Sequence, residues 1–97
     1  MSYVFHPDAM QELAQAVDYY TEHRDSELAR DFLDEIYRLA EMLLNNPGFG
    51  ARVGDQQRRY VVKRFPYSII YRQTPQGIRI LAIEHQKRRP AYWRTRV

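Results

Sequence analysis

Residues 58–93, RRYVVKRFPYSIIYRQTPQGIRILAIEHQKRRPAYW, contain three apolar segments rich in β-branched and aromatic residues. This composition is typical of β-strands. The three segments span residues 60–64, 67–73 and 78–83. Phe65-Pro66 separates the first two, and Thr74-Pro75-Gln76-Gly77 has Pro second and Gly fourth, as a type I turn prefers. The stretch therefore predicts an antiparallel meander of three strands.

Two amphipathic helices are predicted before the meander. Apolar residues recur at helical spacing over residues 8–22 and again along a stripe over residues 28–43. Asp25 or Ser26 can cap the second helix, and Asn45-Asn46-Pro47-Gly48 is a strong helix stop. Because the connection between the helices is short, we expect them to form an antiparallel hairpin.

The remaining segments complete the expected fold. Tyr3-Val4-Phe5 predicts a brief first strand, and residues 48–57, with three of the four glycines, predict a loop from the hairpin to the sheet. The element order predicts one α+β domain over residues 1–97. We expect one face of the meander to pack on the hairpin and the other face to be open. The sequence does not say which side chains face the helices.

Composition narrows the possible function classes. The chain of 97 residues has no cysteine, so disulfides and thiolate metal sites are excluded, and His6 and His23 lack the spacing of a metal site. No signal peptide pattern or stretch long enough to span a bilayer is present. We therefore expect a cytoplasmic protein without a cofactor, a metal ion or a membrane partner.

Charge is divided unevenly along the chain. Residues 1–46 hold 3 Lys+Arg and 10 Asp+Glu, a net charge of −7, whereas residues 47–97 hold 12 and 2, a net charge of +10. Such segregation can steer an acidic or phosphate-bearing partner toward the second half. An ordinary charged surface is the alternative interpretation.

Three motifs occur in an order that suggests a family. They are Asn46-Pro47, the run VKRFPYSIIYR over residues 62–72, and IEHQKRRP over residues 83–90. In this order they resemble the RelE/ParE superfamily of bacterial toxins over nearly the whole chain. The resemblance implies the toxin of a type II toxin–antitoxin system, a growth inhibitor associated with plasmid stabilisation. It also implies that a cognate antitoxin neutralises the toxin in a hetero-oligomer.

The superfamily divides by target, and the residues favour one branch. RelE-like members cleave mRNA on the ribosome with basic residues on the sheet, but the matching positions here are Tyr60, Val62 and Ser68, with Lys63 one residue away. ParE-like members inhibit DNA gyrase, and many carry a histidine after the last strand followed by arginine, as His85 does here. The resemblance therefore implies a ParE-like gyrase inhibitor. A ribonuclease acting with the ribosome and mRNA, or a non-catalytic protein-binding module, is the alternative.

Each alternative has its own candidate residues. Binding of the target is expected at the basic and aromatic end of the chain, since such residues grip phosphates and anchor interfaces. These target-binding candidates are His85, Arg88, Arg89, Tyr92, Trp93 and Arg94. A ribonuclease would need acid–base groups and cations on phosphate. Its candidates are His85, Lys63, Arg64, Arg72, Arg88 and Tyr92. Trp93 could instead fold back over the core.

The helices carry more apolar residues than one buried face requires. The surplus consists of Tyr19, Tyr20, Met42 and Leu44. An apolar groove of this kind can accept a segment of a partner protein. We therefore expect these four residues to bind the antitoxin.

Overall fold

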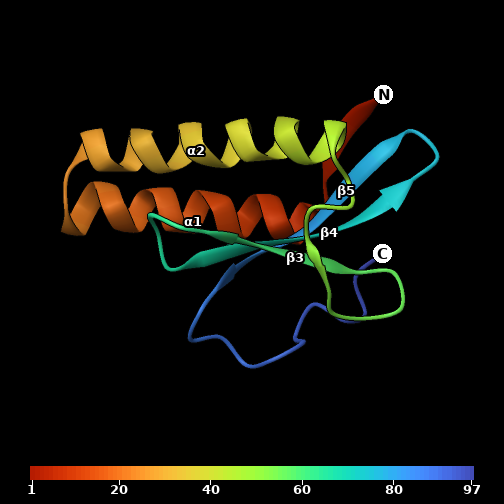
Figure 1. Cartoon of the computed structure of the whole chain (residues 1–97). Coiled ribbons are helices and arrows are strands. Elements are labelled where there is room, and N and C mark those ends of the chain that lie inside the picture. The colour runs from red at the N-terminus through yellow and green to blue at the C-terminus, as the bar shows by residue number, and fades with distance from the viewer.

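The computed structural model describes residues 1–97. A hairpin of two helices, α1 (Pro7–His23) and α2 (Ser26–Asn45), covers one side of a five-stranded sheet (Figure 1). The strands are β1 (Ser2–Phe5), β2 (Ala51–Arg52), β3 (Arg58–Val62), β4 (Tyr67–Thr74) and β5 (Gly77–His85). Their order in the sheet is β1-β5-β4-β3-β2. The α+β class and the helical hairpin are confirmed.

The helices begin and end where the local sequence satisfies their free backbone groups. The Asp25 carboxylate accepts a hydrogen bond of 2.7 Å from the Leu28 amide and caps α2, as the sequence predicted. His6 caps α1 by accepting from the Asp8 amide at 3.0 Å, and Pro7 occupies the first turn. At the end of α2, the Asn46 amide donates to the Leu43 carbonyl. The Asp25 cap lies in the short connection that turns α2 back along α1.

The meander is confirmed, with two additions that the sequence did not predict. β3, β4 and β5 pair antiparallel in chain order, but β1 joins the far edge parallel to β5. Residues 48–57, expected to be a loop, contain the two-residue strand β2, which pairs with β3. The first meander strand is also shifted and covers residues 58–62, because the Phe65 amide bonds the Val62 carbonyl and bends the chain there.

A bulge in β5 changes which residues face outward. Ile70 pairs with Ala82, while the next residue, Tyr71, pairs with Ile80, so Leu81 is an extra residue in β5. Extra residues of this kind bend a strand and redirect its side chains. As a result Leu81 and Ala82 both pack in the same apolar cluster, on the side of the sheet away from the helices.

The two faces of the sheet are therefore both covered. Tyr60 and Val62 pack in the cluster beneath the helices, whereas Ile70 belongs to the cluster on the opposite face. The expectation of an open face is wrong over this second cluster, because the segment after β5 crosses it (Figure 1). The bulge explains this covering, since it directs two adjacent apolar side chains outward that need burial.

Gly77 permits the parallel pairing of β1. It has a φ of +145°, a conformation that residues with side chains rarely adopt, and a Cβ there would collide with the carbonyl oxygen of Ser2. Because Ser2 is paired directly with Gly77, β1 can approach β5 only where the side chain is missing. Neither helix has the length and apolar character needed to cross a membrane.

Candidate functional site

The chain after β5, residues 86–97, carries most of the target-binding candidates and is called the C-terminal tail below. It contains turns but no helix or strand, so side-chain contacts must hold it in place. Trp93 is its main anchor, with 2% of its surface exposed, and it packs on Ile70, Leu81 and Ala82. Trp93 is thus a core residue here and is not available as a surface anchor for a target. Its indole covers the cluster that the β5 bulge turns outward.

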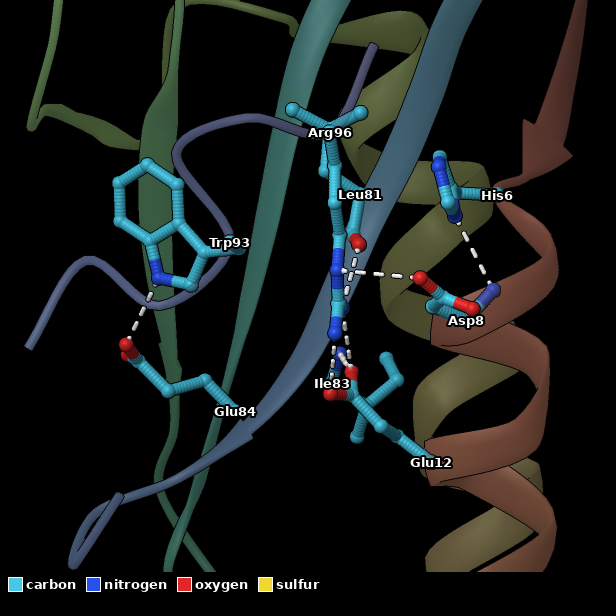
Figure 2. Close-up of polar contacts among 8 residues, drawn as sticks. All are labelled: His6, Asp8, Glu12, Leu81, Ile83, Glu84, Trp93 and Arg96. Atoms are coloured by element: carbon cyan, nitrogen blue, oxygen red, sulfur yellow. Dashed lines mark hydrogen bonds and ion pairs between the residues drawn. The ribbon is translucent and has the colours of Figure 1, made fainter. Parts of the chain in front are cut away.

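A buried carboxylate holds the Trp93 indole in place through a hydrogen bond. The Glu84 carboxylate, on β5, accepts a hydrogen bond of 2.8 Å from the Trp93 indole (Figure 2). The same carboxylate accepts two hydrogen bonds from the Arg59 guanidinium, at 3.0 and 3.2 Å. Glu84 is only 7% exposed, and a buried charge needs such partners. The three side chains therefore fix the tail to β3 and β5 together.

A second ion pair closes the edge of β5. β1 ends at Phe5, so β5 has no neighbouring strand on that side at Leu81 and Ile83. There the Arg96 guanidinium donates to the Leu81 carbonyl at 3.0 Å, and the Glu12 carboxylate accepts from the Ile83 amide at 3.0 Å (Figure 2). Arg96 and Glu12 also bond each other at 3.0 and 3.1 Å. Together they satisfy backbone groups that a further strand would otherwise pair.

At this edge of the sheet, Arg96 stays charged and Tyr92 stays uncharged at neutral pH. Burial lowers the pKa of Arg96, but the hydrogen bonds and charge of Glu12 outweigh it and leave that pKa above its ordinary value. Burial, followed by the nearby Glu12 carboxylate, raises the pKa of the Tyr92 hydroxyl, so Tyr92 remains protonated at neutral pH. The Tyr92 ring lies 3.9 Å from the Arg88 guanidinium and 5.0 Å from that of Arg96. Tyr92 therefore packs against two cations of the tail.

His85 lines a small hollow where the tail leaves the sheet. The hollow has a volume of about 210 Å³ and lies between α1 and the end of β5. Its lining includes His85, Arg88, Tyr67 and Tyr19. The His85 Nδ1 accepts a hydrogen bond of 3.0 Å from the Lys87 amide, which leaves Nε2 as the ring nitrogen free for a partner. The structure thus brings two target-binding candidates next to one antitoxin-binding candidate.

The other target-binding candidates lie on the outside of the tail. Arg89 and Arg94 are exposed and form no ion pair within the chain. Arg88 is exposed as well and stacks on Tyr92. These arginines are free to meet a partner, in contrast to the buried Trp93.

One ribonuclease candidate, Arg72, lies far from His85. Tyr67 pairs with His85, whereas Arg72 pairs with Arg79, five residues farther along β4. At a rise of about 3.4 Å per residue, about 17 Å of strand separates these positions. Lys63 and Arg64 lie in the turn after β3, and Arg64 is 3.8 Å from the Asp31 carboxylate on α2. Arg72 is thus distant from His85, whereas Lys63 and Arg64 lie in the turn that leads into Tyr67, at the same end of the sheet as His85.

The four antitoxin-binding candidates differ in how far their side chains are exposed to solvent. Tyr19 is 55% exposed, but Tyr20 is buried and its ring packs on Phe32 and Phe65 at 5.3 and 5.7 Å. Tyr20 therefore belongs to the core and is not free for a partner. Met42 and Leu44 are half-buried at the rim of the core. Two further exposed apolar residues, Met10 and Tyr37, lie on the helices outside the buried stripe.

Sequence reasoning also missed the polar residues that hold the tail. Glu12, Arg59, Glu84 and Arg96 each look like surface charges in sequence, since Glu12 fits the acidic start of a helix. Only Glu84 gave a signal, as a lone acidic residue in the basic, apolar end of the sheet. No cluster of three or more His, Asp or Glu side chains is arranged to hold a metal ion.

Comparison with known proteins identifies the family to which this architecture belongs. Residues 3–90 match the family described as the ParE toxin of the type II toxin–antitoxin system parDE. A chain in the solved structure of the chromosomal ParDE toxin–antitoxin system from P. aeruginosa is similar, with a TM-score of 0.76 and 25% sequence identity. The match covers 88% of this chain and 95% of that chain. No curated protein matches. Since the family match covers almost all of β1 to β5 and reaches into the C-terminal tail, this chain belongs to the ParE toxin family of type II toxin–antitoxin systems.

Proposed function

We propose that this ParE toxin arrests growth by poisoning DNA gyrase in the cytoplasm and that a cognate antitoxin neutralises it. The proposal rests on the ParE family match and is supported by the distance between Arg72 and His85. General acid–base chemistry requires proton-transfer groups within hydrogen-bond reach of one reacting site. Arg72, a candidate cation for the phosphate, lies about 17 Å along β4 from Tyr67, the strand partner of His85, so Arg72 and His85 are too far apart to act on one phosphate.

The target is expected to bind the exposed arginines of the C-terminal tail. Arg88, Arg89 and Arg94 project from a segment that Trp93 and Arg96 hold rigidly in place. Cations presented by a preorganised segment lose less entropy on binding than cations on a mobile one. The buried contacts of the tail thus support binding without touching the target themselves.

The antitoxin is expected to bind at the hollow beside α1. Tyr19 lies there next to His85 and Arg88, so an antitoxin segment on the helices would also cover part of the target-binding surface. Exposed aromatic residues at such a junction are common anchors of protein interfaces. Neutralisation then follows from overlap of the two binding surfaces.

The target can be tested by inducing the toxin in bacteria and measuring mRNA cleavage and gyrase-linked DNA breaks in parallel. We expect DNA breaks without mRNA cleavage, and inhibition of purified gyrase in a supercoiling assay. The double variant Arg89→Glu with Arg94→Glu should cause neither DNA breaks nor inhibition of gyrase, and it should stay folded by circular dichroism. Arg24→Glu with Arg30→Glu, on the helices, is the matched control and should remain toxic. Cleaved mRNA with intact DNA would contradict the proposal and favour the ribonuclease.

The antitoxin surface can be tested by rescue of growth. Co-expression of the short reading frame expected beside the toxin gene should restore growth to cells that express the wild-type toxin. Tyr19→Glu should remain toxic during co-expression, because a charge would be buried at the interface. Full rescue of Tyr19→Glu would place the antitoxin elsewhere.

A further inference from the structure

The turn that leaves β5 fixes both the orientation and the proton of the His85 ring. The Lys87 amide donates to Nδ1 of His85 at 3.0 Å, and the Arg88 amide donates to the His85 carbonyl at 3.0 Å. The ring also packs edge-on against Tyr67, its partner across the sheet, with 5.0 Å between the ring centres. Because Nδ1 accepts a hydrogen bond, the proton of the neutral ring is on Nε2. At Nε2, His85 therefore offers a hydrogen-bond donor and no base.

Other polar groups that line the hollow beside His85 can also donate. Arg88 lines it and forms no ion pair within the chain. Burial raises the pKa of Tyr67, so its hydroxyl keeps its proton at neutral pH. Glu12 is the one carboxylate in the lining, and Arg96 already bonds it at 3.0 and 3.1 Å (Figure 2). The hollow thus offers a cation and neutral donors, with no unpaired carboxylate of its own.

Half of the residues that line the hollow are apolar or aromatic. They are Ala16 and Tyr19 on α1, Tyr67 on β4 and Ile83 on β5. The volume of about 210 Å³ lies below the range of about 300–1,000 Å³ that is usual for small-molecule pockets. The hollow therefore suits one side chain of a partner protein better than a free metabolite.

We propose that this hollow binds one carboxylate side chain of the antitoxin, with His85 Nε2 and the Arg88 guanidinium as its donors. Hydrogen bonds from such donors to a carboxylate are about twice as strong as those between neutral groups. The apolar half of the lining would then contact the residues that flank the carboxylate. The inference rests on the proposed neutralisation by an antitoxin and adds the chemistry of the contact.

The charge around the hollow favours an isolated carboxylate over the phosphates of a nucleic acid. Helix α1 forms one wall of the hollow, and residues 1–46, which include α1, carry a net charge of −7. A run of phosphates would meet this negative charge on both sides of the single cation Arg88, since like charges repel. A single carboxylate among apolar neighbours avoids this repulsion.

The test is the affinity of the purified toxin for the purified product of the short reading frame expected beside its gene, measured by titration calorimetry. His85→Phe keeps an aromatic ring against Tyr67 but removes the donor, and should weaken binding about 10- to 100-fold. Arg88→Gln removes the cation and should weaken binding by a similar factor. His85→Gln places an amide donor near the position of Nε2 and should keep most of the affinity.

Lys87→Gln is the matched control for the loss of charge. It removes a cation from the same turn but keeps the backbone amide that bonds His85, and the Lys87 side chain does not line the hollow. This variant should bind the antitoxin as the wild type does. Circular dichroism checks the fold of every variant, and Arg88→Gln alters an exposed side chain, so it tests the proposal even if His85→Phe fails to fold.

The carboxylate is identified by changing each Asp and Glu of the antitoxin in turn to Asn or Gln. One of these changes should weaken binding as much as Arg88→Gln does and cause no further loss when combined with it, because the effects of two residues in one contact are not additive. The absence of any such carboxylate would overturn the proposal.

Three further results would also overturn the proposal. They are wild-type affinity of both His85→Phe and Arg88→Gln, an equal loss in Lys87→Gln, and a His85→Phe variant that loses affinity for duplex DNA but not for the antitoxin. The last result would assign the hollow to phosphate. Failure of the antitoxin to bind the wild-type toxin would contradict the proposed neutralisation itself and this inference with it.

Discussion

The helix-facing side of the sheet buries a continuous cluster of 17 residues, whereas the tail-facing side buries a cluster of four. Ion pairs involving Glu84 and Glu12 hold the covering segment on the second side, while the first side relies mainly on apolar packing. Apolar burial is non-directional and adds up over many contacts. A buried ion pair fails when one partner is removed. We therefore expect the tail to detach at a lower free-energy cost than the helices.

The largest effect should follow substitution on the helix-facing side. Phe32 is completely buried, and its ring lies 5.0 Å from the rings of both Phe65 and Tyr67. Phe32→Ala should lower the free energy of unfolding by about 3–5 kcal/mol because it leaves a cavity. Urea unfolding followed by circular dichroism measures this loss. Tyr37→Ala, at a partly exposed site on the same helix, should cost much less; equal losses would contradict the contrast between buried and exposed positions.

A smaller effect is expected on the tail-facing side. Glu84→Gln keeps the shape but removes the charge that pairs with Arg59, and should lower the free energy of unfolding by about 2–3 kcal/mol. Trp93, the single tryptophan, reports this directly, because its fluorescence should shift to longer wavelength as the indole becomes exposed.

The helices serve as the internal reference for that experiment. Glu35→Gln, in the pair that Glu35 forms with Arg38 on the surface of α2, should leave the fluorescence of Trp93 unchanged. Loss of helical circular dichroism together with the fluorescence shift would show that the two faces unfold as one unit.

Alkaline pH should weaken the tail through Tyr92. Because its folded pKa is raised above the ordinary value of 10.0, the unfolded chain loses this proton at lower pH than the folded chain. Stability from Tyr92 is therefore complete below pH 10 and declines above it, by up to about 1.4 kcal/mol per pH unit. Burial raises the pKa of three other tyrosines in the same direction: Tyr20, Tyr67 and Tyr71.

Urea unfolding of the wild type and of Tyr92→Phe at several pH values from 9 to 11 separates these contributions. Above pH 10, the free energy of unfolding of Tyr92→Phe should fall less steeply with pH than that of the wild type. The difference in slope should correspond to about one proton. An identical decline in both proteins would mean that Tyr92 ionises equally easily in the folded and unfolded states.

The smallest effect is expected at His85. Its side chain is partly exposed at the rim of the hollow, so His85→Ala should change stability by less than about 0.5 kcal/mol. If inhibition requires binding and no proton transfer, this variant should also remain toxic. A growth assay with a soluble-protein control decides this. A folded but harmless His85→Ala, with mRNA cleavage by the wild type, would instead assign His85 a proton-transfer role worth about 10²–10⁴-fold in rate.

Elements set by local sequence were predictable, and those set by distant contacts were not. Asp25 as a cap and the Asn45–Gly48 stop depend on neighbouring residues only, so both helices were predicted almost to the residue. The parallel pairing of β1 with β5 depends on contacts across the whole chain. Likewise, the extra Leu81 breaks the alternation that strand prediction relies on.

The exposure of the candidate binding residues was only partly predictable from the sequence. The basic character of the tail is evident from Arg88, Arg89 and Arg94, and these residues are exposed as expected. Trp93 was assigned to target binding, but it is buried because the β5 bulge exposes an apolar cluster for it to cover. Nothing in sequence spacing links Glu84 to Trp93, since the tail that joins them has no periodic structure.

The parallel register of β1 also bears on the order in which the chain assembles. Ser2 must meet Gly77, a partner 75 positions away, whereas β4 and β5 are joined by a turn of two residues. Closing a long loop costs more entropy and is slower than forming a hairpin. We therefore expect β1 to dock late, after the meander has formed. Until then β5 presents an unpaired edge, so a nascent toxin would be most prone to aggregation just before its first strand takes its place.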